Sequence, residues 1–145
     1  MIELRKATND DISFLKNLRV LSMKEHVLES GSKYKDEEQL QRIEYEFQHA
    51  AIVTKNNKDI GLFKVNKDNS PWDLIQIQIH PKFQGQGIGR ELLSLLINEA
   101  VNKQVNIKLS VFKKNPALKL YLSVGFTIID EGDKSFIMQY LSNII

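Results

Sequence analysis

Apolar residues recur along the chain with two different spacings, which predict strands in some segments and helices in others. Alternation at every second position is typical of a strand with one buried face. It occurs at residues 2–6, 74–79 and 106–112, and the segments 50–54, 60–65, 127–130 and 135–141, separated by turn residues, are also predicted as strands. A spacing of three to four positions is typical of an amphipathic helix, and it occurs at residues 12–21, 40–47, 88–101 and 115–124. The order βααβββαβαββ predicts a mixed α/β fold, with residues 1–145 forming a single domain.

Glycines cluster where the strand at 74–79 leads into the helix at 88–101. The junction has the sequence Gln-Gly-Gln-Gly-Ile-Gly-Arg over residues 84–90. The first N–H groups of a helix have no partner within the helix, and the positive end of the helix dipole lies behind them. Glycine has no Cβ, so a ligand can approach the backbone closely. The junction therefore predicts a site for a phosphate or diphosphate.

Two familiar glycine patterns do not fit this junction. A nucleotide P-loop requires Gly-Lys-Ser/Thr, but Gly89 is followed by Arg90 and Glu91. A dinucleotide fingerprint requires G-x-G-x-x-G and an acidic residue about 20 positions later. Here the spacing is G-x-G-x-G, and residues 100–129 contain no Asp or Glu. A third pattern, Gln-x-x-Gly-x-Gly, does fit, with Gln84, Gly87 and Gly89 at its defining positions. The alternative is that the junction is an ordinary strand-to-helix turn that binds no ligand.

A second motif follows at residues 115–126. Its sequence matches Asn-x-x-Ala-x-x-x-Tyr-x-x-x-Gly-Phe, with Asn115, Ala117, Tyr121, Gly125 and Phe126 at the defining positions. The two motifs, in this order and with this order of elements, resemble the GNAT superfamily of N-acetyltransferases. The resemblance covers nearly the whole chain. It implies a central mixed sheet flanked by helices, in which two central strands splay apart at one end.

The resemblance also implies a reaction and a cofactor site. Enzymes of this family transfer an acetyl group from acetyl-coenzyme A to a primary amine of a small molecule or a peptide, by direct attack in a ternary complex. Residues carried over as cofactor-binding are the strand residues Ile77, Gln78 and Ile79, the loop residues Gln84, Gly85, Gln86, Gly87, Ile88, Gly89 and Arg90, and Asn115 and Tyr121.

The chemistry requires an acid and a base. An alkylammonium has a pKa of about 10.4, so the acceptor amine must lose a proton before or during attack. By the resemblance, Tyr121 is the general acid that assists the departing sulfur, and a packed helix tyrosine is the alternative. The sequence does not assign the base, because the strand at 74–79 carries Gln76 and Gln78 where some relatives have a glutamate. The candidates are His26, Asp73, Glu44, Glu46 and His80, or a water chain.

The acceptor is not identified by the sequence. The segment 27–38 carries several acidic residues, which would suit a cationic amine or the start of a helix. Trp72 is expected either to line the cleft that holds the acceptor or to anchor the core. A retained cofactor site with lost catalysis, an acyl-CoA-binding module, is the alternative function.

Composition excludes several classes of binding partner. The formal charge of +2 is too even to indicate a nucleic-acid partner, and no apolar run is long enough to span a bilayer. The chain has no cysteine and only three histidines, so we expect no metal site. Five lysines at positions 103–119 would suit a polyanionic cofactor or a solvated face. We therefore expect a cytoplasmic protein that acts without metal. The resemblance implies a homodimer as a possible assembly, because many relatives form dimers.

Overall fold

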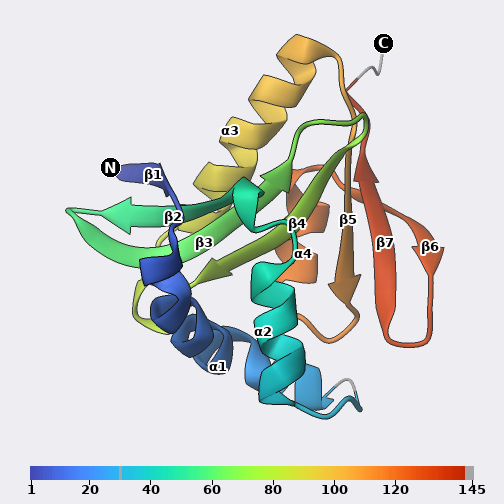
Figure 1. Cartoon of the computed structure of the whole chain (residues 1–145). Helices are drawn as coiled ribbons and strands as arrows, with labels where there is room; N and C mark the ends of the chain where they lie inside the picture. The colour runs from blue at the N-terminus through green and yellow to red at the C-terminus, as the bar shows by residue number, and fades with distance from the viewer. Residues whose placement is uncertain (30, 143–145) are drawn as a thin grey trace.

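The computed structural model describes residues 1–29 and 31–142. Seven strands form one sheet in the order β1-β2-β3-β4-β5-β7-β6 (Figure 1). The strands are β1 Ile2–Lys6, β2 Ala50–Lys55, β3 Lys58–Asn66, β4 Trp72–Ile79, β5 Ile107–Phe112, β6 Thr127–Glu131 and β7 Ser135–Tyr140. The α-helices are α1 Ile12–Glu29, α2 Asp36–Glu44, α3 Ile88–Lys103 and α4 Ala117–Val124. This confirms the mixed α/β fold and the order of elements that the sequence predicts.

Each face of the sheet is covered by its own helices. Leu15 and Leu18 of α1 and Ile43 of α2 pack with strand residues such as Ile52 and Leu62. The neighbouring positions on the strands point to the opposite face, where α3 and α4 pack. This alternation explains why β2 and β3 are nearly continuous apolar runs, since both of their faces are buried. Trp72 is 4% exposed within the second of these cores, so it is a core anchor.

The helix α1 is longer than the sequence pattern predicts, because it continues past Leu21 to Glu29. Its start is tied to the sheet by Asp11. The Asp11 carboxylate accepts hydrogen bonds from Arg5 at 2.9 and 2.7 Å and from the N–H of Thr8 at 2.8 Å. The guanidinium of Arg5 holds the pKa of Asp11 below its usual value. The later turns of α1 are thereby directed across the sheet toward the end of β4.

The strands β4 and β5 are paired along only part of their length. The parallel register joins Trp72, Asp73 and Leu74 to residues 107–109, and the pairing stops there. Beyond this point the two strands diverge, whereas β4 remains paired with β3 as far as Ile79. One edge of β4 is therefore left open over its last residues.

A β-bulge lies at the point of divergence. The register with β3 passes from Leu74 directly to Gln76, which leaves Ile75 as the extra residue. Because a bulge shifts the phase of the side chains, Trp72 and Leu74 face the same core as Ile77 and Ile79. Ile75 instead lies beside Gln76 in a surface cavity under α2. The alternation in sequence predicts Ile75 on the face of Ile77 and Ile79, and the bulge makes that assignment wrong.

A buried lysine fixes α2 on the sheet. Lys64 of β3 is 1% exposed, and its Nζ donates to the carbonyl oxygens of Arg42, Ile43 and Tyr45 at 3.2, 3.0 and 2.7 Å. These are carbonyls at the end of α2, which have no partners within the helix. Burial lowers the pKa of the Lys64 amine to about 8. The helix dipole and the three acceptors favour its ammonium form at neutral pH.

We expect Lys64→Met to lower the free energy of unfolding by about 2–3 kcal/mol, because buried carbonyls at the end of α2 would lose their donor. Denaturant unfolding at pH 7 measures the change. Lys58→Met at the exposed start of the same strand is the matched control and should leave stability nearly unchanged. Equal stability of the two variants would show that Lys64 does not hold α2 in place.

Candidate active site

Two cavities meet at the open edge of β4. The first, the loop pocket, has a volume of about 360 Å³ and is formed by α1, β4, the glycine junction and the start of α4. The second, the fork pocket, has a volume of about 300 Å³ and lies where β4 and β5 diverge. Both are lined by Met23, Ile77, Gln78 and Asn115. A ligand that spans the two pockets would therefore pass along the edge of β4.

The open edge of β4 presents the backbone of Ile77 and Ile79. Residues of an antiparallel strand direct their N–H and C=O groups alternately to the two sides. A Cβ on Gly61 of β3 would lie 2.5 Å from the carbonyl oxygen of Gln78, and the N–H of His80 donates to β3 at 2.7 Å. The backbone of these two residues thus faces β3, and that of Ile77 and Ile79 faces the opening.

Gln78 contributes differently from the sequence-based expectation, which placed its backbone toward the cofactor. Its backbone faces β3, but its side chain lines both pockets and is 4% exposed. The Oε1 atom is buried without a hydrogen-bond partner among the described residues. A buried amide oxygen without a partner is costly, so this atom is suited to accept a hydrogen bond from a ligand or a water.

The glycine junction offers a run of free N–H groups. Among the described residues, no backbone hydrogen bond uses the N–H groups of residues 85–90, and the first bond of the helix is Glu91 N–H to Gly87 at 2.9 Å. Gly85 and Gly87 have φ of +77° and +79°, which side chains other than glycine rarely adopt. A Cβ at either position would meet no atom within 4 Å, so the space above the backbone is open. The junction fits a diphosphate.

Gln84 positions the junction. Its N–H donates to Pro81 at 3.3 Å within the short turn Pro81–Phe83, and its side chain donates to the carbonyl of Ile79 at 2.9 Å. The sequence predicts that Gln84 supplies an amide to the ligand, but that amide is already in use. The Gln84 side chain instead ties the junction to the end of β4.

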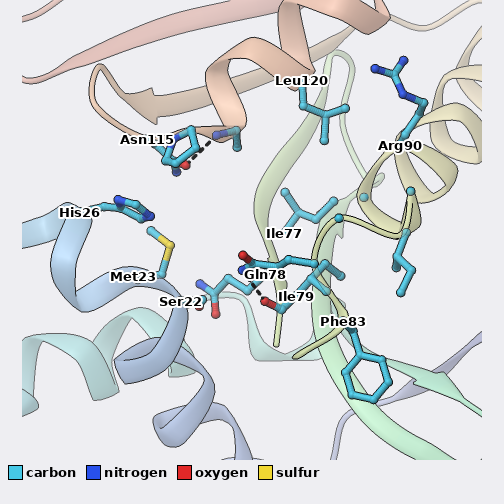
Figure 2. Close-up of a pocket in the computed structure, with 17 residues that line it drawn as sticks. Ser22, Met23, His26, Ile77, Gln78, Ile79, Phe83, Arg90, Asn115 and Leu120 are labelled. Atoms are coloured by element: carbon cyan, nitrogen blue, oxygen red, sulfur yellow. Dashed lines mark hydrogen bonds between the residues drawn. The ribbon is translucent and has the colours of Figure 1, made fainter. Parts of the chain in front are cut away.

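Asn115 and Arg90 lie on either side of the loop pocket (Figure 2). The Oδ1 of Asn115 accepts from the N–H of Ala117 at 2.9 Å, so the side chain caps α4 as well as lining both pockets. The Nη2 of Arg90 donates to Ser123 of α4 at 2.9 Å. Lys103 and Lys113, from the lysine-rich segment, form ion pairs with glutamates at 3.8 and 2.5 Å.

His26 lies in the last turn of α1 and lines the loop pocket together with Ser22 and Met23. Figure 2 shows the imidazole and Met23 extending from α1 toward the strand that carries Gln78. The Nδ1 atom of His26 is buried and has no hydrogen-bond partner among the described residues. The structure thus places the imidazole beside the open edge of β4.

Tyr121 lies on α4 and lines the fork pocket, whereas the glycine junction lines the loop pocket. It is 6% exposed, and its ring packs against Phe126 at 5.8 Å between centroids. Burial raises the pKa of the phenol above its usual value of 10.0. Tyr121 therefore remains a neutral O–H donor throughout the physiological range.

Of the other candidate bases, two form structural contacts and two lie away from the cavities. His80 accepts from the N–H of Lys82 at 3.1 Å through Nδ1, which shapes the turn before the glycine junction. Glu46 accepts from Asn66 at 2.7 Å and lies 3.5 Å from His49. Asp73 and Glu44 line none of the three cavities.

In the described part of the chain, no cluster of His, Asp and Glu side chains could hold a metal, and no helix is both long and apolar enough to cross a bilayer.

Several residues at the site were not identified from the sequence. Arg19 and Arg42 line the fork pocket, and Arg19 is 3% exposed although its charge predicts a surface position. Gly61 of β3 lies against the paired side of β4, opposite the open edge, and its signal was the isolated glycine within a predicted strand. The amphipathic pattern of α1 does not predict that Arg19 is buried. The pattern identifies the polar face of the helix, but it does not show that α2 packs over part of that face.

Comparison with known proteins gives a consistent family. Residues 21–136 match the family model described as acetyltransferase (GNAT) domain. Over 99 residues, the chain is 29% identical to an uncharacterized N-acetyltransferase, ycf52, of Gracilaria tenuistipitata var. liui. The match covers 63% of this chain, and the chain spans about half, 52%, of that relative's length.

Solved structures share the fold. The PaiA N-acetyltransferase from Thermoplasma acidophilum, determined in complex with coenzyme A, superposes with a TM-score of 0.75 at 19% identity, covering 97% of this chain and 99% of that one. The ribosomal-protein-S18-alanine N-acetyltransferase from Escherichia coli superposes with a TM-score of 0.72 at 19% identity, covering 100% and 96%. These likenesses confirm the arrangement of sheet and helices.

We expect Gly87→Val to abolish binding of coenzyme A, because a β-branched residue resists the positive φ and its side chain would fill the open space above the N–H groups. Calorimetric titration with coenzyme A measures the affinity. Gly132→Val, in the turn between β6 and β7, is the control and should bind normally. Unchanged affinity of the folded Gly87→Val protein would place the phosphates elsewhere.

Proposed function

Because the chain belongs to the GNAT acetyltransferase family, we propose that it transfers the acetyl group of acetyl-coenzyme A to a primary amine in a ternary complex, with residues 1–145 acting as one catalytic domain. The observation that carries this proposal is the open edge of β4 between two cavities, beside a run of free N–H groups. A second candidate, an acyl-CoA-binding module without catalysis, is favoured by the glutamines at 76 and 78, which cannot accept a proton.

The residues present fit coenzyme A. The N–H groups of residues 85–90 would hold the diphosphate, and the backbone of Ile77 and the N–H of Ile79 would pair with the amides of the pantetheine arm, since the Ile79 carbonyl already accepts from Gln84. Asn115 contacts both pockets and would bound the arm on the opposite side. Acetyl-coenzyme A supplies an acetyl group that is already activated as a thioester.

The geometry suggests how one proton leaves the acceptor amine. As the new C–N bond forms and the C–S bond breaks, the amine nitrogen must lose a proton. We assign its acceptor as the His26 imidazole, because Nδ1 is buried beside the pocket without another partner. Histidine is the side chain that accepts and releases protons near neutral pH. An N–H of Ile77 or Ile79 would stabilise the negative charge that develops on the carbonyl oxygen.

Tyr121 assists at the sulfur. Its position in the fork pocket and its buried, neutral phenol support the role of hydrogen-bond donor to the sulfur as the C–S bond breaks. Because burial raises the pKa of the phenol, Tyr121 keeps its proton before the reaction begins. Its hydrogen bond to the sulfur becomes strong only as negative charge develops on the sulfur in the transition state.

A screen of primary amines that follows release of free coenzyme A from acetyl-coenzyme A tests the proposal. Transfer to at least one amine, with mass increase of the acceptor by one acetyl group, is the expected result. Tight binding of coenzyme A with no transfer to any amine in a broad screen would instead support the binding module.

For Tyr121→Phe we expect turnover to fall by about a hundredfold, the scale typical of one proton donor, while the affinity for coenzyme A stays the same. Since the pKa of Tyr121 is raised, the wild-type enzyme should show no loss of activity from phenol ionisation up to pH 10. Steady-state rates from pH 6 to 10 measure both. If Tyr121→Phe turned over as fast as the wild-type enzyme, Tyr121 would not be the donor to the sulfur.

For His26→Gln we expect kcat to fall by about tenfold to a hundredfold below pH 8, because the amine then loses its proton acceptor. The deficit should shrink at higher pH, where more of the amine is already neutral. The control is Glu25→Gln, the neighbouring exposed residue of α1. A deficit that is constant across pH would indicate that His26 only shapes the pocket.

A further inference from the structure

Cationic side chains gather on the α1 and α2 side of the fork pocket. Arg19 of α1 is 3% exposed, and its Nε and Nη2 both donate to Oε1 of Gln39, at 2.8 and 2.6 Å. Arg42 of α2 lines the same pocket. Burial first, and then the charge of Arg42, lowers the pKa of Arg19 to about 10. Burial first, and then the charge of Arg19, lowers the pKa of Lys64.

Acidic groups compensate these charges only weakly: Glu46 raises the pKa of Lys64, but this effect is smaller than that of burial. Among the residues that the structure describes, no carboxylate forms an ion pair with Arg19, Arg42 or Lys64. Glu46 is held by Asn66 at 2.7 Å, and Lys64 is satisfied by three carbonyls. Gln39 is a neutral acceptor and cancels no charge.

A buried guanidinium without a counter-ion is costly unless something on or near the protein compensates it. Gln39 uses one oxygen for two of the five N–H groups of Arg19, which leaves the guanidinium without an anionic partner. A packed structural arginine is usually matched by an acid on a neighbouring element. The cluster therefore points to an anion that enters the fork pocket from outside the chain.

The pocket also relates this anion to the reaction. Arg19 and Arg42 line the same cavity as Tyr121 of α4 and the side chain of Gln78, and this cavity reaches the edge of β4 where transfer is proposed. A molecule in the fork pocket can thus present an amine to the edge of β4 and an anionic group to the guanidiniums. The volume of about 300 Å³ is the size of a small-molecule site.

We propose that the acceptor is a free amino acid, whose carboxylate is held by Arg19 and Arg42 while its amine faces the edge of β4. This rests on the proposed acetyl transfer and names its substrate class. Guanidinium groups bind carboxylates through paired, charge-assisted hydrogen bonds. The amine nitrogen forms a bond to the acetyl carbon, the C–S bond breaks, and one proton passes from the amine to His26, so the product is an N-acetyl amino acid and free coenzyme A.

This proposal replaces the cationic acceptor that the acidic segment at 27–38 suggested. Of the acidic residues in that segment, only Glu38 lines a cavity, and that cavity is the outer one under α2, where Glu38 lies 3.9 Å from Lys35. Asp36 and Glu37 occupy the first turn of α2, where the helix dipole accounts for them. The wall that faces the reacting edge is cationic.

The test compares matched acceptors. The twenty common L-amino acids are assayed with acetyl-coenzyme A, and the best of them is compared with its carboxamide and with the amine that lacks the carboxyl group. We expect kcat/KM of the free amino acid to exceed both by at least about tenfold, mainly through KM. A polyamine and a peptide with an amidated C-terminus complete the series. Equal or faster transfer to any acceptor without a carboxylate would overturn the proposal.

The variant Arg42→Gln tests the cation directly, since Arg42 is exposed and its loss should not prevent folding. We expect KM for the amino acid to rise by about tenfold, with no change in kcat/KM for the amine that lacks the carboxyl group. Lys16→Gln removes the same charge from an exposed position of α1 outside the pockets and should change neither. An equal loss for both acceptors in Arg42→Gln would contradict carboxylate recognition.

A binding measurement separates this proposal from the proposed reaction. Calorimetry of the protein saturated with coenzyme A should detect the amino acid, and Arg42→Gln should weaken that binding by about tenfold. If no amine is acetylated but this Arg42-dependent binding is found, the anion subsite stands and the transfer proposal fails. If amines without a carboxylate are acetylated and no amino acid binds, the transfer proposal stands and the anion subsite fails.

Discussion

The divergence of β4 and β5 is the constraint on which the rest of the site depends. Three residue pairs hold the strands together, and then the sheet opens, so that backbone groups of Ile77 and Ile79 have no strand partner. Unpaired backbone groups inside a sheet are costly unless a ligand or water pairs with them. The open edge thus provides both a binding surface and a reason for a ligand to bind there. The bulge at Ile75 allows the opening while β4 remains paired with β3.

The surroundings of this edge divide into two sides with different chemistry. On one side, the junction at residues 85–90 offers N–H groups above an open space, which favours a diphosphate. On the other side, α1 and α2 bring together Arg19 and Arg42, which favour a second anion. The Asp11 and Lys64 contacts hold these two helices on the sheet. Asp11 and Lys64 line neither pocket, and these structural charges thereby fix the position of the charges that face a substrate.

The fold and the geometry of the glycine junction were predictable, because local sequence determines them. Glycines at 85 and 87 are required by positive φ, and the helix dipole follows from the strand-to-helix junction itself. The acceptor side was not predictable in the same way. Arg19 and Lys64 become buried only because α2 packs over them, and their partners lie 19 to 22 positions away. The register shift at Ile75 depends on β3 and leaves no clear mark in the pattern of apolar residues.

The central claim is that the edge of β4 and the amides of residues 85–90 bind coenzyme A together. Amide hydrogen exchange followed by NMR, with and without saturating coenzyme A, tests it most directly. We predict slower exchange at Ile77, at Ile79 and at residues 85–90, with no comparable change in the fully paired strand β2. Saturable binding that leaves these amides exchanging as fast as in the free protein would contradict the account.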